Sequence, residues 1–154
     1  MRAKATAPLF AMLVILSIVA SACDDKSPTT PAPTQIDVTG RWATDITVQT
    51  IPTRMTWTLT QTGTAVTGPV LVGLANGIVL FNGFLTGTLT GSSLAYTITV
   101  GPGGIPSQPT CTGQLGGTMA VSFGVVSSMV GPMSLISSNC TLQLPSTNLT
   151  LTKQ

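Results

Sequence analysis

Residues 54–61 read RMTWTLTQ and residues 94–100 read LAYTITV, and these two stretches decide the fold. In both, large apolar side chains occupy every second position, and threonine or another small or polar residue fills most positions between them. A period of two is typical of a β-strand that buries one face and exposes the other. Threonine, valine and isoleucine also favour strands over helices. The two stretches therefore predict strands of a half-buried sheet.

The same alternation continues on both sides of these stretches, and turn residues divide it into short segments. Thr62-Gly63 and Gly91-Ser92-Ser93 supply residues that tolerate the positive φ angles of tight turns. We predict strands near residues 38–49, 54–61, 65–73, 78–90, 94–100, 116–123, 128–136 and 147–153. The boundaries are least clear in residues 70–85, where two Asn-Gly pairs interrupt a nearly continuous apolar run.

Eight strands joined by short turns form an up-and-down meander, which has two exposed edges unless it closes. The sequence offers neither edge charges nor helices to protect those edges, and closure into a barrel removes them. We therefore predict an all-β domain over residues 37–154, a small antiparallel up-and-down β-barrel of about eight strands. A barrel of this size holds packed side chains or one small ligand.

The amino terminus has the features of an export signal. Arg2 and Lys4 precede an apolar run over residues 8–20 that is too short to span a bilayer comfortably. The run ends in ASAC, residues 20–23, which resembles the lipobox of bacterial lipoproteins. That resemblance implies a signal peptide over residues 1–22 and a mature chain that begins with an acylated Cys23. Ordinary secretion, with cleavage before an unmodified cysteine, is the alternative.

The segment that follows is polar and rich in proline and threonine. Residues 23–36 are expected to comprise the lipidated Cys23 and a disordered tether, because proline keeps such a chain extended and no large apolar residue is available for a core. The expected location is outside the cytoplasm, lipid-anchored to the cell membrane or the outer membrane and facing the periplasm or the exterior. The sequence does not distinguish between these two membranes.

The chain has three cysteines, an odd number for an exported protein. Acylation of Cys23 leaves Cys111 and Cys140 to form a disulfide in an oxidising compartment. A pair of free thiols is the alternative. We expect no metal site, because the chain has no histidine and neither cysteine has a second ligand at usable spacing.

Gly40-Arg41-Trp42 stands at the start of the first predicted strand and resembles the G-x-W motif of the calycins, the superfamily of lipocalins and avidins. The length and strand order of residues 38–153 resemble that superfamily as well. In lipocalins the tryptophan closes the barrel floor, and a cation from the last strand packs over it. The resemblance implies this barrel-floor role for Gly40, Trp42 and Lys153. The alternative is that Trp42 is an ordinary core aromatic residue.

Composition restricts the chemistry available to the chain. Its acidic residues are four aspartates, Asp24, Asp25, Asp37 and Asp45, and it has no histidine. A serine nucleophile would have almost no base to activate it, so we expect no enzymatic activity and no cofactor. Without the signal peptide, four cations balance the four aspartates, and a neutral chain is a poor partner for nucleic acid.

Binding is the function that this composition leaves open. We expect the barrel to hold a small apolar or amphipathic ligand, lined by inward side chains such as Met55, Trp57 and Tyr96. The alternative is a structural or protein-interaction module of the cell envelope, which would meet its partner through the apolar segment 70–85 or through the threonine-rich outer face. The sequence identifies no protein partner.

Overall fold

The computed structural model describes residues 36–141 and 146–154 of the chain. Within them every regular element is a β-strand, and no helix is long and apolar enough to cross a bilayer. The predicted signal peptide, Cys23 and all of the tether except Ile36 lie outside the described residues. The strands are β1 (Gly40–Val48), β2 (Ile51–Thr62), β3 (Ala65–Gly73), β4 (Val79–Thr90), β5 (Ser93–Val100), β6 (Gly113–Ser122), β7 (Ser128–Ser138) and β8 (Thr147–Lys153).

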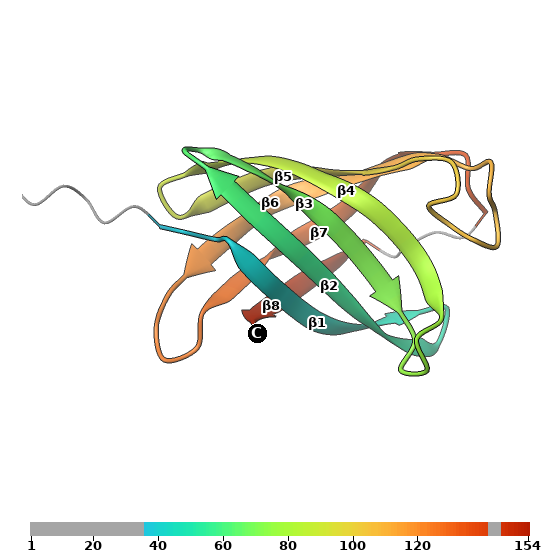
Figure 1. The fold of residues 1–154 in the computed structure, drawn as a ribbon, viewed down its shortest axis with the longest axis horizontal. Coiled ribbons are helices and arrows are strands. Elements are labelled where there is room, and N and C mark those ends of the chain that lie inside the picture. Colours follow the sequence, from blue (N-terminus) through green and yellow to red (C-terminus); the bar gives the residue numbers. More distant parts are fainter. Residues whose placement is uncertain (1–35, 142–145) are drawn as a thin grey trace, which may run out of the picture. The chain divides into compact units, whose positions relative to one another are not determined.

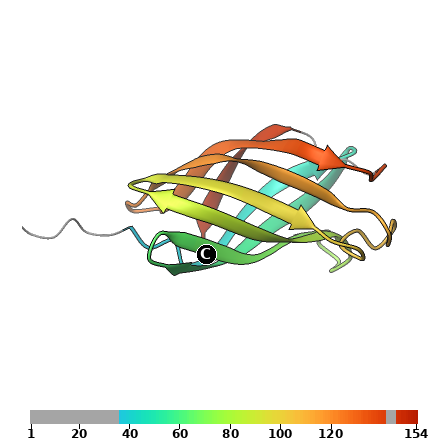
Figure 2. The same ribbon diagram turned by 90° about the horizontal axis from the view of Figure 1, so that it is seen from above.

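The eight strands form one closed antiparallel barrel (Figures 1 and 2). Each strand pairs with the next in sequence, and β8 returns to pair with β1. The predicted fold class is therefore confirmed. Two strands begin three residues earlier than their predicted starts, β2 at Ile51 and β6 at Gly113.

The barrel encloses a single apolar core. Along β2 and β5 the buried positions alternate with exposed or partly exposed ones, as the period of two predicts. The largest fully buried side chains are Trp42, Met55, Trp57, Leu59, Leu85, Leu94, Ile98, Met119, Met129, Met133, Leu149 and Leu151. These side chains come from seven of the eight strands. The core can therefore be buried completely only when the sheet is closed.

The segment 70–85 contains one turn, although its sequence has two Asn-Gly pairs. Asn76-Gly77 forms the turn between β3 and β4: Gly77 has a φ of 86°, and the Ile78 amide donates a hydrogen bond of 3.2 Å to Asn76 Oδ1. A register shift between Val72 and Gly73 accompanies it. Asn82-Gly83 instead lies within β4, where the Asn82 amide donates to the carbonyl of Gly104 in a neighbouring loop.

Glycine allows β6 and β7 to approach each other closely near the middle of their pairing. A Cβ atom at Gly117 would overlap the carbonyl oxygen of Pro132, and one at Gly131 would overlap the carbonyl oxygen of Thr118. Backbone on both sides leaves no room for any other residue. These glycines therefore fix the path of the two strands around the core.

Candidate functional site

The barrel end at which the described chain begins is sealed around Trp42. Its ring is fully buried, and its Nε1 donates a hydrogen bond of 2.8 Å to the carbonyl of Val38. Lys153 Nζ lies 5.5 Å from the centroid of this ring and 5.8 Å from that of Phe123. The Phe123 ring meets Trp42 edge-on at 6.4 Å. The structure thus brings together Trp42 and Lys153, which come from the two ends of the domain sequence.

The segment before β1 is held at the same end of the barrel by hydrogen bonds to one side chain. Gln61, at the end of β2, accepts a hydrogen bond from the Val38 amide at 2.9 Å and donates one to the Ile36 carbonyl at 3.0 Å. Asp37 is exposed between these two residues, and hydrogen bonds from Thr39 lower the pKa of its carboxyl below the usual value. The chain therefore enters the barrel at the Trp42 end.

Met55, Trp57 and Tyr96, the predicted ligand-lining residues, all lie in the barrel interior. The Trp57 and Tyr96 rings stack at an angle, with centroids 4.9 Å apart. The Tyr96 hydroxyl donates a hydrogen bond of 3.0 Å to the Pro132 carbonyl, and burial raises the pKa of this hydroxyl. The buried Trp57 Nε1, by contrast, finds no hydrogen-bond partner within residues 36–141 and 146–154. A buried donor without an acceptor costs about 1–3 kcal/mol.

The seam between β1 and β8 is the part of the barrel wall with the fewest register pairs. The register of these two strands joins only Trp42 with Lys153 and Ala43 with Thr152, although β1 continues to Val48. A half-open cleft of about 420 Å³ lies beside the unpaired part of the seam. Its lining residues are Thr44, Asp45, Ile46, Thr47, Pro52, Thr147, Asn148 and Leu149. We call this space the seam cleft.

The seam cleft adjoins the interior residues predicted from the sequence. Thr44, which lines it, faces Met55 across the β1–β2 pair, and Trp57 lies two residues further along β2. The lining combines hydroxyl groups and one carboxylate with the apolar side chains of Ile46 and Leu149. Such a surface suits a ligand that has both a polar and an apolar part.

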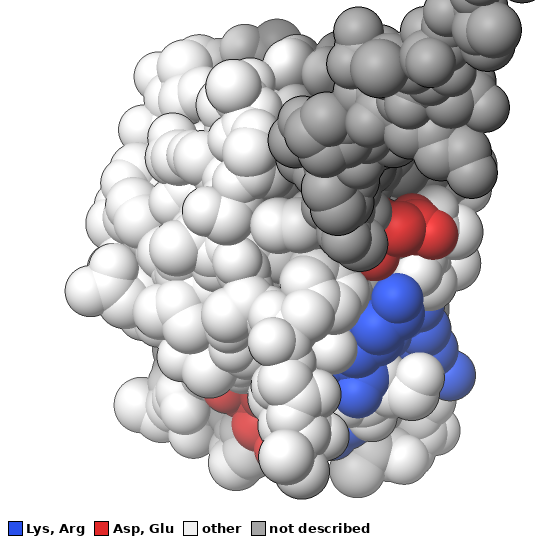
Figure 3. All heavy atoms as spheres, turned by 90° about the vertical axis from the view of Figure 1, so that its left-hand side faces the viewer, with Lys and Arg blue, Asp and Glu red and all other residues white. Residues whose placement is uncertain are grey.

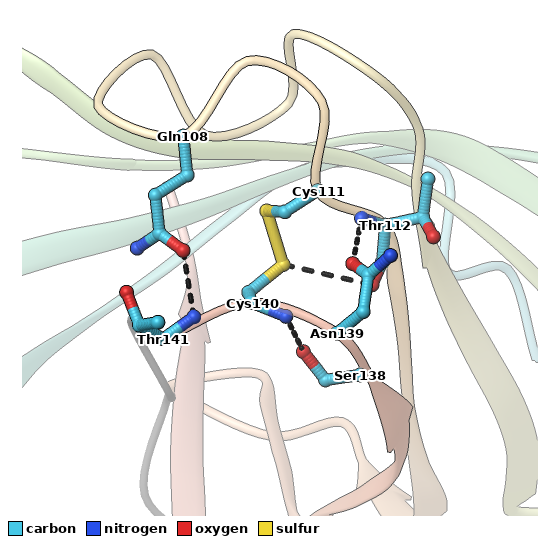
Figure 4. Close-up of a disulfide and its surroundings, with 7 residues drawn as sticks. All are labelled: Gln108, Cys111, Thr112, Ser138, Asn139, Cys140 and Thr141. Carbon is cyan, nitrogen blue, oxygen red and sulfur yellow. Dashed lines mark hydrogen bonds between the residues drawn. A yellow bond between two sulfur atoms is a disulfide. The ribbon is translucent and has the colours of Figure 1, made fainter.

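The disulfide lies at the opposite end of the barrel, beyond the end of β5 and the end of β7. Figure 4 shows it with its surroundings. Cys111 and Cys140 are bonded, as predicted, and join the loop before β6 to the segment after β7. Side-chain oxygens secure the two segments on each side: Asn139 Oδ1 accepts from the Thr112 amide at 2.7 Å, and Gln108 Oε1 accepts from the Thr141 amide at 2.6 Å. The disulfide therefore stabilises the connection between these two loop segments, and neither cysteine lines the seam cleft.

Sequence reasoning found the interior residues and missed the seam cleft. β8 has enough residues to continue the β1–β8 register as far as Val48, but the pairing ends at Ala43 and Thr152. The cleft therefore arises where two strands of sufficient length fail to pair, and no sequence signal in either strand marks that point.

Cys23, the predicted lipidation site, lies outside the described residues. Within the described part of the chain, no group of three or more His, Cys, Asp or Glu side chains gathers to hold a metal ion. In comparisons of the whole chain, no protein family, no curated protein and no solved structure matches it.

Proposed function

We propose that this chain is an exported lipoprotein, anchored to a bacterial envelope membrane through Cys23, whose calycin-like barrel binds a small amphipathic ligand at the seam cleft. Binding, and not catalysis, is the proposed role. The observation that carries the ligand proposal is the seam cleft itself, which lies where β1 and β8 continue side by side but pair at only two positions.

Three features support the anchor. The ASAC sequence at residues 20–23 follows a signal-like apolar run. The Cys111–Cys140 bond uses two of the three cysteines, so Cys23 is the one that remains for acylation. A disulfide is also the expected state in an oxidising compartment outside the cytoplasm. The calycin resemblance is supported by the closed eight-strand barrel and by the contact between Lys153 and Trp42.

The size and lining of the seam cleft set the ligand class. A volume of about 420 Å³ falls in the range of small-molecule sites. Ile46 and Leu149 offer apolar contacts at its inner side, while threonine hydroxyls and Asp45 offer hydrogen bonds near solvent. A short acyl or isoprenoid chain with an uncharged polar group fits this pattern, because the Asp45 carboxylate is already paired with Arg54 at 3.2 Å and the remaining polar groups are hydroxyls and an amide.

A ligand screen with a cleft-filling variant tests the binding site. Amphipathic candidates are added to the mature protein, and the melting temperature and native mass spectrum are recorded. Thr47→Trp places a large ring in the cleft from an exposed position and should abolish the ligand-induced shift. Thr67→Trp, on the exposed face of β3, is the matched control and should retain it. A panel without binders, or equal shifts in both variants, would refute the proposed site.

Intact-mass analysis of the membrane fraction tests the anchor. The wild-type chain should carry the mass of diacylglycerol and be found with membranes, whereas Cys23→Ser should be released without added mass. Wild-type protein of unmodified mass in the soluble fraction would instead indicate ordinary secretion.

A role in protein interaction is the second candidate, and one observation favours it. Leu71 and Phe84 lie on the outer face of neighbouring strands, about half exposed, and Ile78 is exposed in the turn between these strands. Replacing Leu71 and Phe84 with threonine should remove a protein partner from pull-downs of solubilised membranes without changing the melting temperature. Unchanged partners would dismiss this surface.

A further inference from the structure

We propose that the loop between β6 and β7, residues 123–127, inserts into the surface of the membrane that carries the Cys23 lipid and so holds the Trp42 end of the barrel against it. This inference rests on the proposed anchor and adds a second, noncovalent membrane contact. It assigns the barrel a fixed orientation, with the seam cleft and the disulfide directed away from the bilayer.

The first observation is the apolar tip of this loop. Its sequence is FGVVS, and Val125 is fully exposed, Val126 is 64% exposed and Phe123 is 45% exposed. The turns at Gly63 and Gly91, at the same end of the barrel, carry threonine and serine instead. Apolar side chains gathered at a protruding tip gain free energy when an apolar phase covers them.

The second observation is where the chain enters the barrel. Phe123 packs against Trp42, and the Trp42 indole N–H donates a hydrogen bond to the carbonyl of Val38, two residues beyond Ile36. In Figure 1 the β6–β7 loop and the segment before β1 accordingly lie at the same end of the barrel. Ile36 is only thirteen residues from Cys23, at most about 45 Å of fully extended chain. The loop and the route to the lipid therefore share one end of the barrel, and a protein held by Cys23 can bring this end to the membrane surface.

The third observation is charge. Figure 3 faces this end and shows Lys and Arg side chains gathered in one patch. Arg54 forms an ion pair with Asp45 at 3.2 Å, so its charge is largely balanced locally. Lys153 is the cation that the structure places beside the loop, since its Nζ lies 5.8 Å from the centroid of the Phe123 ring. An exposed lysine next to an apolar tip suits an interface that contains anionic headgroups.

The apolar tip alone is too small for stable membrane binding. A barrel that is already tethered to the membrane does not need a strong affinity of its own. Two valines and part of one phenylalanine bury little area, so a free barrel would bind vesicles weakly. A short tether raises the local concentration of the barrel at the surface to the millimolar range, where a weak contact is populated. The lipid thus supplies attachment, and the loop supplies orientation.

Depth-dependent quenching tests the insertion on the anchored protein. The mature chain, with Cys111 and Cys140 bonded, is coupled through the Cys23 thiol to maleimide-bearing vesicles of phosphatidylethanolamine and phosphatidylglycerol. Val125→Trp places a reporter at the tip, and Ile78→Trp places one on an exposed apolar position in a loop at the opposite end. The emission of the wild-type tryptophans is subtracted from each spectrum. Lipids spin-labelled at a shallow depth should then quench the reporter at position 125 at least about threefold more strongly than the reporter at position 78.

A second substitution checks that the apolar tip causes this difference. Val126→Asp, added to Val125→Trp, should lower the quenching to the reference value, and Ile78→Asp in the same background should leave it unchanged. Equal quenching at both ends, or no effect of Val126→Asp, would overturn the proposal. Self-association is the competing explanation for the apolar tip. The proposal would fail if the reporter at position 125 were quenched no more than the reporter at position 78 and sedimentation showed a dimer that Val126→Asp disrupts, because the tip would then bind a second copy of the chain.

The coupling separates this inference from the anchor on which it rests. Vesicle attachment here is chemical, so the quenching result does not depend on acylation in cells. A missing lipid mass on the cellular protein would refute the anchor alone, and absent quenching on coupled vesicles would refute loop insertion alone.

Discussion

Lys153 and Trp42 are register partners across the barrel seam, and Lys153 Nζ also lies 5.5 Å from the centroid of the Trp42 ring. The contact joins the last strand to the first at one of the two residue pairs that close the wall. Its cation is exposed while its ring is fully buried, so the lysine stem covers the indole and its charge stays in water. The pair therefore contributes to both the floor and the closure of the barrel.

Removing the charge of Lys153 should weaken this closure. Lys153→Met keeps most of the apolar stem and loses the cation–π contact, which is worth about 0.5–1 kcal/mol at an exposed site. Urea unfolding should show a loss of that size. Arg41→Met, which removes an exposed cation from the neighbouring position on β1, is the control and should unfold like the wild type; an equal loss in both would assign the effect to general charge.

Breaking the disulfide should cost more than any surface change. Cys111 and Cys140 are 29 residues apart, and a crosslink over that separation restricts the unfolded chain by about 3–4 kcal/mol in the chain-entropy model. The Cys111→Ala/Cys140→Ala variant should lose this amount in denaturant unfolding. The wild type should become equally unstable in reductant, whereas the variant should not respond to reductant. A reductant-insensitive wild type would contradict the prediction.

A methyl group at Gly117 or Gly131 should destabilise the barrel strongly. Each new Cβ would overlap a carbonyl oxygen of the facing strand, and two backbones cannot separate without breaking the β6–β7 pairing. Gly117→Ala and Gly131→Ala should each cost about 3 kcal/mol. Gly101→Ala is the matched control, since a Cβ there has nothing within 4 Å, and its melting temperature should stay near that of the wild type.

Stability should fall at alkaline pH because of Tyr96. Burial raises the pKa of its hydroxyl above the ordinary value of 10.0, so the unfolded chain releases this proton at lower pH than the folded barrel does. Its contribution is fully present below about pH 10 and is lost as the pH rises through the folded-state pKa. Tyr96 is the only tyrosine in the chain, so tyrosinate absorbance follows it directly. Tyr96→Phe should flatten this part of the pH profile.

The strand pattern could be predicted from the sequence because one physical rule governs most of the domain. Stretches such as residues 94–100 alternate strictly, and an alternating stretch has one stable register when one face is buried. The disulfide was predicted from the cysteine number together with the expected export and acylation of Cys23, and the Cys111–Cys140 bond is present. The predicted strand 54–61 starts too late, because β2 begins at Ile51 and includes Pro52. A proline is tolerated there because pairing with β3 begins only at Arg54, so Pro52 has a neighbouring strand on one side only.

The parts that escaped prediction depend on distant contacts. The predicted strand 116–123 included Phe123, but β6 ends at Ser122 and the Phe123 ring packs against Trp42. Gly113 and Gln114 have weak strand propensity, and they extend β6 only because β5 and β7 pair with them. The seam cleft depends on how β1 and β8, which are far apart in sequence, pair with each other. The alternation of residues within each strand does not determine that pairing.

The up-and-down order has a consequence for how the domain assembles. Seven of its eight strand pairings join consecutive strands, and each can form as soon as one hairpin has been made. The remaining pairing brings Trp42 to Lys153 across 111 residues, so it has the largest loop to close. Until β8 docks, the edge of β1 has no neighbour on one side, and the folding intermediate is most vulnerable there to pairing with a foreign strand.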